Sequence, residues 1–523
     1  MKELIYHRGF VPAVTRYGSK TCVIDGSYQA SYEQHADRVF RLANVLNRKL
    51  GISRQDRFAV MAANSHEYLE LYHAAYLGAG VINPLNLRLA GKELDYIVRD
   101  SGTNVAFVDQ HFAPIFHDAM QKVEGQSPIR TTVLLGEGEG PCDLHYEDLL
   151  ASSVADIPEE PDEDDMVILM YTGGTTGLPK GVVVTQRAEI LNCYHCSMAL
   201  NSFGKDEVGL IQTPIFHAAS MVSLLATTSS GGTQVLVPTF EPGAVIEVIE
   251  RHRVTVTMMV PTMIAMMLNH PDFEPERIQS LRSLTYGASP MPAVLLDRLL
   301  EMLPELELTQ GYGMTECSSV LTILGADEHR AGGRVLRSVG LPVPGVEICI
   351  QGKDGDALPT GETGEVCAKG GNFMIEYWNK AEATQEAFRD DWYHTGDAGY
   401  LDEAGYLFLV DRVKDMIISG GENIYSAEVE NAISSHPAVD QVAVIGIPDE
   451  TWGEAVHAVV VLAAGAQATE DEIIDHARES IGGYKVPKSV EFRTNPLPLS
   501  GALKVLKREL RAPYWEGKDK AIG

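Results

Sequence analysis

A glycine- and threonine-rich segment that ends near a lysine has the clearest chemistry in this 523-residue chain. Residues 172–181 read TGGTTGLPKG. Glycines let the backbone turn so that several N–H groups point at one anion. Threonine hydroxyls add donors and the lysine adds a point charge. We therefore expect a polyphosphate site formed by Thr172, Gly173, Gly174, Thr175, Thr176, Gly177 and Lys180.

The segment differs from the Walker phosphate loop, G-x-x-x-x-G-K-[ST]. Leu178 and Pro179 separate Gly177 from Lys180, and no Ser or Thr follows the lysine. A Walker loop opens a helix. Residues 182–184 are instead three valines, which favour a strand.

The segment resembles the signature loop of the acyl-adenylate-forming enzymes, which include acyl-CoA synthetases, peptide-synthetase adenylation domains and luciferases. Further motifs follow in family order and spacing from about Ser31 to Leu510. The usual second residue of the loop is Ser. Gly173 here removes one hydroxyl donor and keeps the backbone cradle. The resemblance implies a ligase that uses Mg²⁺ and ATP to convert a carboxylic acid into acyl-AMP and pyrophosphate. It then transfers the acyl group to coenzyme A and releases AMP.

The resemblance also assigns residues that contact the adenine and the phosphates. Gly287, Ala288 and Ser289 correspond to a segment whose backbone frames the adenine. In the motif QGYGMTE at 310–316, an aromatic ring can face a purine, a hydroxyl can reach the α-phosphate and a carboxylate is a hard ligand for Mg²⁺. The residues implied in this motif are Gly311, Tyr312, Gly313, Thr315 and Glu316.

The ribose is implied to contact residues further along the chain. Asp397, in the motif YHTGD, would accept hydrogen bonds from both ribose hydroxyls. Arg412 would hold the ribose and phosphate region, and the resemblance places an interdomain hinge at Lys414.

Lys504 falls at the invariant lysine of the family's C-terminal motif and is the expected catalytic cation. A cation there would stabilise the negative charge that develops as the carboxylate attacks the α-phosphorus. The family normally has Gly before this lysine, and this chain has Leu503. Either the loop has adapted, or adenylation is impaired, or the residue is an engineered replacement.

Coenzyme A is the acceptor that the sequence favours, because no carrier-protein segment is fused to the chain. Ser419, Gly420, Gly421 and Glu422 resemble the lining of the pantetheine tunnel. Ser426 stands where the family commonly has Pro and is expected to cap the helix that follows. The stretch 485–520 holds nine Lys and Arg against four Asp and Glu, and it either binds the CoA phosphates or is surface charge.

His217 lies in a segment that resembles the wall of the acyl pocket. Amino-acid-activating relatives have Asp at this position, so an amino-acid substrate is disfavoured. His217 is expected either to gate the site or to be a buried structural histidine. Met221 and Met259 are apolar and adaptable, and are expected to line a pocket for a fatty, aryl or alicyclic acid or to be generic core.

Alternating helical and strand-like segments are expected to position these residues. Helical spacing is seen at 31–50 and 67–77, and short apolar runs at 57–61, 105–108 and 166–171. Residues 156–165 hold seven acids in ten and are expected to form a solvated loop. A hairpin turn is expected at 402–405, followed by a charged break at 411–415.

The pattern predicts an α/β fold with a large N-terminal domain of packed sheets and a small mobile α+β C-terminal domain. Residues 1–411 are expected to hold the acyl and ATP sites, and residues 412–523 the catalytic lysine. In the second domain we expect a helix from Ala427, strands at 442–445 and 458–462, and a helix from Glu470.

Composition restricts the partners. The formal net charge of −30 disfavours nucleic acid and anionic membranes. No apolar run approaches the ~18 residues of a spanning helix, and the N-terminus lacks the apolar stretch of a signal peptide. We therefore expect a cytoplasmic protein without stable membrane insertion, and the sequence leaves a homodimer open. Two alternative functions also stay open: a ligase that loads an acyl carrier protein, and an adenylation-impaired nucleotide-binding protein.

Overall fold

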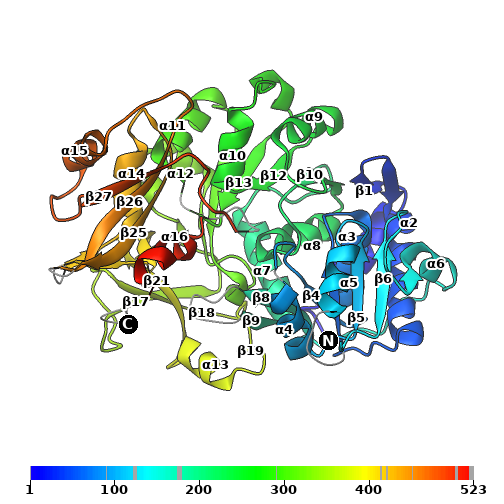
Figure 1. Cartoon of the computed structure of the whole chain (residues 1–523). Coiled ribbons are helices and arrows are strands. Elements are labelled where there is room, and N and C mark those ends of the chain that lie inside the picture. Colours follow the sequence, from blue (N-terminus) through cyan, green and yellow to red (C-terminus); the bar gives the residue numbers. More distant parts are fainter. Residues whose placement is uncertain are drawn as a thin grey trace.

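The computed structural model describes residues 2–89, 91–121, 127–172, 179–289, 291–412, 415–419, 422–449, 452–500 and 505–516. Over these ranges the chain forms a large α/β part and a smaller α+β part near the C-terminus, which lie side by side in Figure 1. This arrangement confirms the expected fold class.

An eight-stranded sheet carries the two strands that flank the phosphate segment. The described strands run in the order β19-β9-β8-β4-β3-β5-β6-β7, and all neighbours from β8 to β7 are parallel. Strands β8 and β9 form an antiparallel pair, and β19 pairs antiparallel with β9. The bounds are β3 Arg57–Met61, β4 Val81–Pro84, β5 Val105–Asp109, β6 Thr131–Leu135, β7 Leu144–His145, β8 Met166–Thr172, β9 Lys180–Thr185 and β19 Glu376–Tyr377.

A nine-stranded sheet carries the segments expected at the adenine. Its described strands run in the order β16-β15-β14-β13-β12-β10-β11-β1-β2 and are parallel from β14 to β1. Their bounds are β1 Thr21–Asp25, β2 Tyr28–Ser31, β10 Val208–Ile211, β11 Thr233–Leu236, β12 Val256–Met259, β13 Ser283–Gly287, β14 Glu307–Tyr312, β15 Thr322–Leu324 and β16 Leu341–Pro342.

Helices connect the strands and supply the core between the two sheets. One continuous apolar cluster joins side chains of α1, α2, α3, α7 and α8 to strands of both sheets, so the sheets are fixed relative to each other. The helices of this part are α1 His7–Tyr17, α2 Tyr32–Asn44, α3 His66–Tyr76, α4 Gly91–Ser101, α5 Ala113–Gln121, α6 Tyr146–Ala151, α7 Gln186–Ala199, α8 Met221–Ser230, α9 Pro242–His252, α10 Pro261–Leu268, α11 Ala293–Met302, α12 Ala326–Ala331 and α13 Ala381–Ala387.

A third, antiparallel sheet leads to the C-terminal part. It contains β17 Val346–Gln351, β18 Gly364–Gly370, β20 Phe388–Arg389, β21 Trp392–Leu401 and β22 Leu407–Arg412. Strands β21 and β22 are joined by the turn expected at 402–405. Arg412 is the last residue of β22, where its Cα is paired with that of Asp397.

The C-terminal part is a fourth sheet covered by helices. It contains β23 Ile417–Ser419, β24 Glu422–Ile424, β25 Val439–Asp449, β26 Gly453–Leu462, β27 Ser489–Arg493, α14 Ser426–Ser434, α15 Glu470–Ser480 and α16 Lys507–Trp515. Each helix and strand expected here is present. The expected helix cap is wrong: Ser426 is the first helical residue, and its buried hydroxyl contacts Lys507 Nζ at 2.5 Å instead of capping α14.

The acidic segment 156–165 is a loop, as expected, but several of its acidic residues form ion pairs. Glu163 pairs with Arg187, and Asp162 with Lys2. Arg54 lies within ion-pair distance of three acids of the loop. The loop therefore ties the N-terminus to the eight-stranded sheet. In the described ranges no helix has both the length and the apolar character needed to cross a bilayer.

Candidate active site

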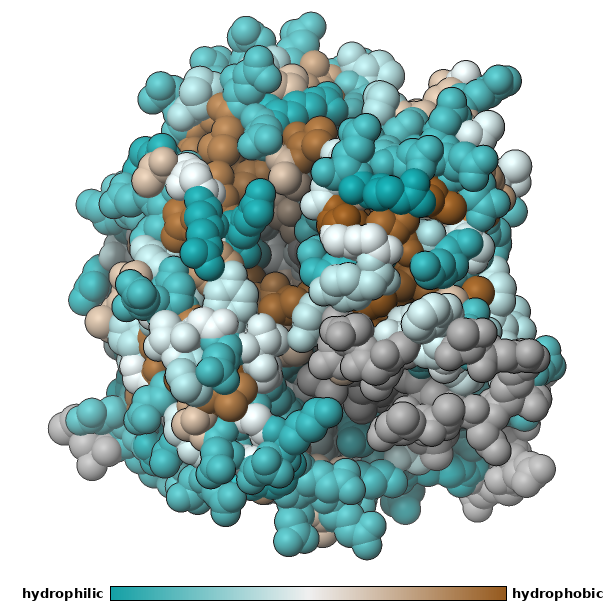
Figure 2. Space-filling model, turned by 90° about the vertical axis from the view of Figure 1, so that its left-hand side faces the viewer, coloured by the Kyte–Doolittle hydropathy of each residue, from teal (hydrophilic) through white to brown (hydrophobic). Residues whose placement is uncertain are grey.

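A deep cleft opens between the large part and the C-terminal part. Its volume is about 2620 Å³, and its lining residues come from both parts. A typical small-molecule pocket has about 300–1,000 Å³. The cleft therefore has room for a nucleotide and a second substrate together. Figure 2 shows the hollow, with hydrophobic side chains around it and hydrophilic ones beyond.

The phosphate segment connects β8 and β9, an antiparallel pair near one edge of the eight-stranded sheet. Thr172 ends β8 and Lys180 begins β9, and these two residues are cross-strand partners. Both line the cleft. Gly173, Gly174, Thr175, Thr176 and Gly177 lie outside the described residues. The Lys180 ammonium lies 4.7 Å from the centre of the Tyr377 ring.

At the carboxyl ends of β13 and β14, two glycines leave the backbone at the cleft without side chains to cover it. Gly287 and Gly311 are paired across these parallel strands. A Cβ on Gly287 would lie 2.3 Å from the Gly311 carbonyl oxygen, so no side chain fits there. Ala288 follows with a φ of 66°, a conformation that costs a non-glycine residue energy. Ala288, Ser289, Gly311 and Gly313 all line the cleft, where a flat ligand could stack on them.

Tyr312 and Asp397 meet in the cleft although 85 residues separate them. The Tyr312 hydroxyl donates to Asp397 Oδ2 at 2.7 Å. Burial and the nearby carboxylate raise the pKa of Tyr312, so it remains a donor. The Asp397 N–H donates to Thr395 Oγ1 at 3.1 Å. The carboxylate expected to bind ribose is therefore held beside the ring expected to bind adenine. The side chain of Arg412 lies outside the described part.

Thr315 and Glu316 lie on a short 3-10 helix, Thr315–Cys317, that follows β14. Both line the cleft. The Glu316 carboxylate accepts a hydrogen bond of 2.8 Å from the Tyr377 hydroxyl, and the Glu316 carbonyl accepts one of 2.7 Å from the Met374 N–H. The metal ligand expected from the sequence motif is thus held through both its side chain and its backbone.

The turn after Glu316 has an unusual backbone. Ser318 and Ser319 have φ values of 55° and 113°, a region that favours glycine. Two buried amides hold this turn: Asn192 Nδ2 and Asn372 Nδ2 each donate to the carbonyls of Cys317 and Val320, at 2.9 to 3.2 Å. Such strain persists where the surroundings enforce it. The two asparagines therefore help to fix the position of Thr315 and Glu316.

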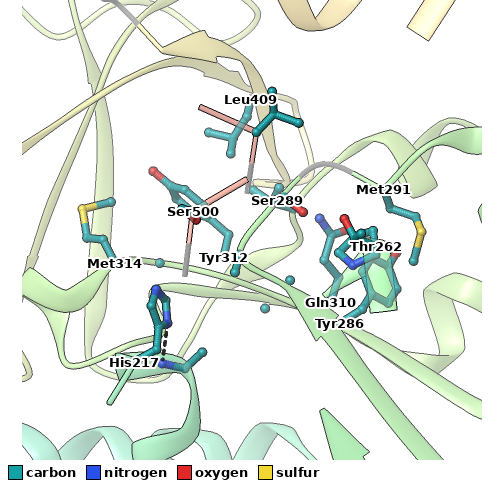
Figure 3. Close-up of a pocket in the computed structure, with 18 of the residues that line it drawn as sticks. His217, Thr262, Tyr286, Ser289, Met291, Gln310, Tyr312, Met314, Leu409 and Ser500 are labelled. Carbon is teal, nitrogen blue, oxygen red and sulfur yellow. Dashed lines mark hydrogen bonds between the residues drawn. The ribbon is translucent and has the colours of Figure 1, made fainter. Parts of the chain in front are cut away.

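The C-terminal part reaches the cleft through the segment before the expected catalytic lysine. Arg88 Nη1 donates to the carbonyls of Leu499 and Ser500, at 2.7 and 2.9 Å. Leu499 also forms an isolated bridge with Val505. Ser500 lines the same cavity as Tyr312 and Ser289, as Figure 3 shows. Leu503 and Lys504 lie outside the described residues.

The opposite end of the cleft is apolar. His217 lines it and begins a 3-10 helix, where its Nδ1 accepts a hydrogen bond of 3.4 Å from the Ala219 N–H. In Figure 3 His217 and Met314 lie on one side of the cavity, and Thr262 and Met291 on the other. Further lining residues at this end are Cys196, Leu200, Phe203, Leu210, Phe216, Val222, Ser223, Thr227 and Met258.

Met221 and Met259 are not among the lining residues. Both are fully buried, Met221 in the core between the sheets and Met259 in the core beneath α9 and α10. Side chains alternate along a strand, so Met258 faces the cleft and Met259 faces the other side. For Met221 the neighbours Val222 and Ser223 take the lining positions on α8. Of the two expectations from the sequence, pocket lining or hydrophobic core, the second therefore describes both methionines.

In the segment expected to line the pantetheine tunnel, Ser419 is the residue whose side chain is described. Ser419 pairs with Glu422 and Gly453 in the fourth sheet, and it is absent from the described lining. Gly420, Gly421, the Glu422 side chain and the hinge residue Lys414 lie outside the described residues. Two cations of the basic stretch already carry acidic partners: Lys485 pairs with Glu428 and Lys507 with Glu430, both at 2.7 Å.

The donor set at the phosphate end fits Mg²⁺ bound to a polyphosphate. Magnesium prefers hard oxygen ligands from one or two carboxylates together with substrate phosphates. Glu316 supplies a carboxylate in the cleft, and Lys180 supplies a cation for phosphate oxygens. Tyr377, Asn192, Asn372 and Arg88 were not identified from the sequence. Their segments carry no motif that marks them, and only the tertiary fold brings them to Glu316 and Ser500.

Two family models match this chain, and together they cover most of the segments that line the cleft. The family described as AMP-binding enzyme matches residues 10–378, and the AMP-binding enzyme C-terminal domain matches residues 428–504. A feruloyl-CoA synthase of Amycolatopsis sp is 40% identical over 495 residues, which cover 94% of this chain and 96% of that protein.

Other relatives and a solved structure are similar to this chain over almost its whole length. A fatty acid–[acyl-carrier-protein] ligase of Streptomyces coeruleorubidus is 35% identical and covers 93% of this chain and 92% of its own length. A long-chain-fatty-acid–CoA ligase of Mycobacterium tuberculosis is 36% identical, with 92% and 93% covered. The crystal structure of ATP-bound MatB from Rhodopseudomonas palustris superimposes with a TM-score of 0.87 at 30% identity and covers 98% of this chain and 99% of that one.

Proposed function

This chain belongs to the AMP-binding enzyme family, and we propose that it activates an apolar, aromatic carboxylic acid that carries a ring hydroxyl or methoxy group. It is an AMP-forming ligase of the acyl-adenylate-forming superfamily that uses ATP and coenzyme A. The nature of the acid is the proposal, and it rests on the apolar end of the cleft.

The observation that carries the proposal is a pair of hydroxyl groups, those of Ser223 and Thr227, in a described part of the cleft wall that has no charged residue. Described lining residues between 196 and 227 include no Asp, Glu, Lys or Arg. Ser223 and Thr227 are four residues apart on α8, so their side chains share one face. Among the described residues neither hydroxyl has a hydrogen-bond partner, and both line the cleft. An aromatic acid with an oxygen on its ring would supply that partner. The feruloyl-CoA synthase relative supports this choice.

We assign the two half-reactions to the residues as follows. The acid carboxylate attacks the α-phosphorus of ATP, a P–O bond to the acid forms, and the bond to the β-phosphate oxygen breaks. Thr315, Glu316 and Lys504 act on this step, and Mg²⁺ held by Glu316 would neutralise phosphate charge. The CoA thiolate then attacks the acyl carbon and AMP leaves. Rotation about Lys414 would bring the expected tunnel segment to the cleft for this second step; its described residue Ser419 is absent from the present lining.

A second acid class is favoured by another part of the cleft. Lining residues continue along and between α10 and α11 through Thr262, Met266, Met291 and Leu295. Met266 is 43% exposed, so this arm reaches the surface. Such an arm could take an alkyl chain, and the fatty-acid ligase relatives support this alternative. The carrier-protein ligase relative keeps a carrier protein as an alternative acceptor.

Acid-dependent exchange of pyrophosphate into ATP tests the acid. Ferulate, cinnamate, octanoate and palmitate would be compared with wild-type protein and with Ser223→Ala. We expect ferulate to be preferred, and Ser223→Ala to lower kcat/KM for ferulate by about tenfold while cinnamate, which lacks ring oxygens, is unaffected. Preference for palmitate that Met266→Trp abolishes would establish the alkyl-chain alternative instead. Thioester formation with free CoA decides the acceptor.

A further inference from the structure

Tyr377 lies between the two charged groups that face the phosphate end of the cleft. Its hydroxyl donates to the Glu316 carboxylate at 2.8 Å, and its ring lies 4.7 Å beneath the Lys180 ammonium. We propose that Tyr377 is a positioning residue that sets the carboxylate of Glu316 for nucleotide-bound Mg²⁺ and the ammonium of Lys180 for the phosphates. This inference rests on nucleotide binding in the cleft.

The backbone around Tyr377 connects the same two elements. Strand β19 pairs with β9, so Tyr377 lies opposite Val182, two residues after Lys180. On one side of it the Trp378 N–H donates to the Gly181 carbonyl at 2.7 Å, and on the other the Met374 N–H donates to the Glu316 carbonyl at 2.7 Å. The segment 374–378 thus fixes the distance between the phosphate segment and the 3-10 helix that carries Glu316.

The environment of the phenol keeps it a hydrogen-bond donor. Tyr377 is 7% exposed, and its hydroxyl lies 3.5 Å from that of Tyr393. At 2.8 Å from the Glu316 carboxylate, which can only accept, the hydroxyl is placed to donate. A carboxylate that accepts a hydrogen bond on Oε1 has lost the freedom to rotate about its last bond. Its orientation toward the cleft is then set before a metal arrives.

The ring has a separate effect on the lysine. A lysine side chain is flexible and its ammonium is a strongly hydrated point charge. The face of an aromatic ring attracts such a cation and limits the positions that it samples. Replacement of Tyr377 by Phe would keep the ring and remove the hydroxyl, with its bond to Glu316 and its longer contact with Tyr393. Replacement by Leu would remove the ring contact with Lys180 as well.

These two variants give the test. Dissociation constants are measured by calorimetry, without any acid substrate, for ATP with Mg²⁺ and for ATP with a chelator. For Tyr377→Phe we expect MgATP to bind about five- to thirty-fold more weakly, while metal-free ATP binds as to wild type. For Tyr377→Leu we expect metal-free ATP to bind more weakly as well, by about two- to thirty-fold.

A purely structural role for Tyr377 makes a different prediction. It would lower the melting temperature of both variants and leave the ratio of the two dissociation constants unchanged, and that result would overturn the inference. Tyr146→Phe is the matched control, since the Tyr146 hydroxyl donates to the Glu70 carboxylate at 2.6 Å and lies outside the cleft lining. It should lose stability without any change in either constant. If wild-type protein bound no ATP, the nucleotide site itself would be wrong, which is a separate outcome.

Discussion

Arg88 and Ser500 are joined across the cleft: the Arg88 guanidinium donates to the Ser500 carbonyl at 2.9 Å and to the adjacent Leu499 carbonyl at 2.7 Å. Arg88 belongs to the large part and follows β4, whereas Ser500 belongs to the C-terminal part. Since Lys504, the expected catalytic cation, is only four residues beyond Ser500, we expect this contact to influence where it is delivered.

Arg88→Ala should therefore slow adenylation. Loss of hydrogen bonds from a charged group costs about 1.5–3 kcal/mol, so we expect acid-dependent pyrophosphate exchange to fall about ten- to hundredfold. Arg54→Ala is the control, because Arg54 also donates to a backbone carbonyl, that of Glu160, but outside the cleft lining. Equal exchange rates in the two variants would contradict a role for the Arg88 contact.

Asn372→Ala should loosen the strained turn after Glu316. Removal of one of the two amides leaves Asn192 alone on the Cys317 and Val320 carbonyls, at a cost of about 1–3 kcal/mol. We expect kcat/KM for MgATP to fall about tenfold or more, measured by pyrophosphate exchange over a range of ATP concentrations. Asn44→Ala removes a similar amide-to-carbonyl bond at the surface and should leave kcat/KM unchanged. An Asn372→Ala protein that is destabilised but kinetically normal would argue against this positioning.

Glu189→Gln should stabilise the protein at neutral pH. Glu189 is fully buried in α7, and among the described residues neither carboxylate oxygen has a partner. Burial raises the pKa of Glu189 far above its usual 4.5. Below pH 4.5 both folded and unfolded states hold the proton, and stability is then lost as pH rises through the folded pKa.

Urea unfolding at pH 5 and pH 8 would measure this effect. We expect Glu189→Gln to raise the free energy of unfolding by about 1–3 kcal/mol at pH 8 and by much less at pH 5. Glu382→Gln, at an exposed position of α13, should change neither value. A gain from Glu189→Gln that is equal at both pH values would show that the carboxyl is not the group responsible.

His73→Gln should reduce the sensitivity of the protein to acid. His35 Nε2 and His73 Nδ1 lie 2.8 Å apart in the core. Burial lowers the pKa of His73 to about 3 from 6.5. Stability is therefore present above pH 6.5 and lost as pH falls toward 3, by about 2 kcal/mol between pH 6.5 and 5. Urea unfolding across this range should show a shallower slope for His73→Gln, whereas His111→Gln, at the surface, should keep the wild-type slope.

Leu503→Gly should raise the adenylation rate if the loop of this chain carries a penalty for its non-glycine residue. Glycine adopts backbone angles that leucine avoids. The measurement is pyrophosphate exchange with the preferred acid, with Leu306→Gly, in a loop outside the motif and the cleft lining, as the control. An unchanged rate would indicate that the loop has adapted to leucine.

Local sequence predicted the helices and strands well, and the tertiary partners of individual side chains poorly. Val442–Ile445 and Arg57–Met61 were predicted as strands because apolar runs bury themselves locally. The meeting of Tyr312 with Asp397 followed from family resemblance, since no local pattern links positions 85 residues apart. Met259 was assigned to the pocket together with its neighbours, because composition does not tell which of two adjacent strand residues faces a cleft.

Partners that act through a hydrogen bond were harder to find. Tyr377 is an aromatic residue on a two-residue strand, and the sequence around it gives no sign that Glu316 lies opposite. Ser426 has a residue type that suits a helix cap, yet the proximity of Lys507, 81 residues later, decides what its hydroxyl does. Both depend on how separate elements pack.

The ion pairs of the loop 156–165 make the attachment of the first residues sensitive to ionic strength. Lys2 pairs with Asp162, and the backbone N–H groups of Glu3 and Leu4 donate to Glu163, all close to solvent. Dissolved ions weaken such charge pairs, while the apolar core beneath gains nothing from low salt. At high salt the N-terminal residues should therefore detach from the loop before the core unfolds. They should then be the first residues accessible to an aminopeptidase.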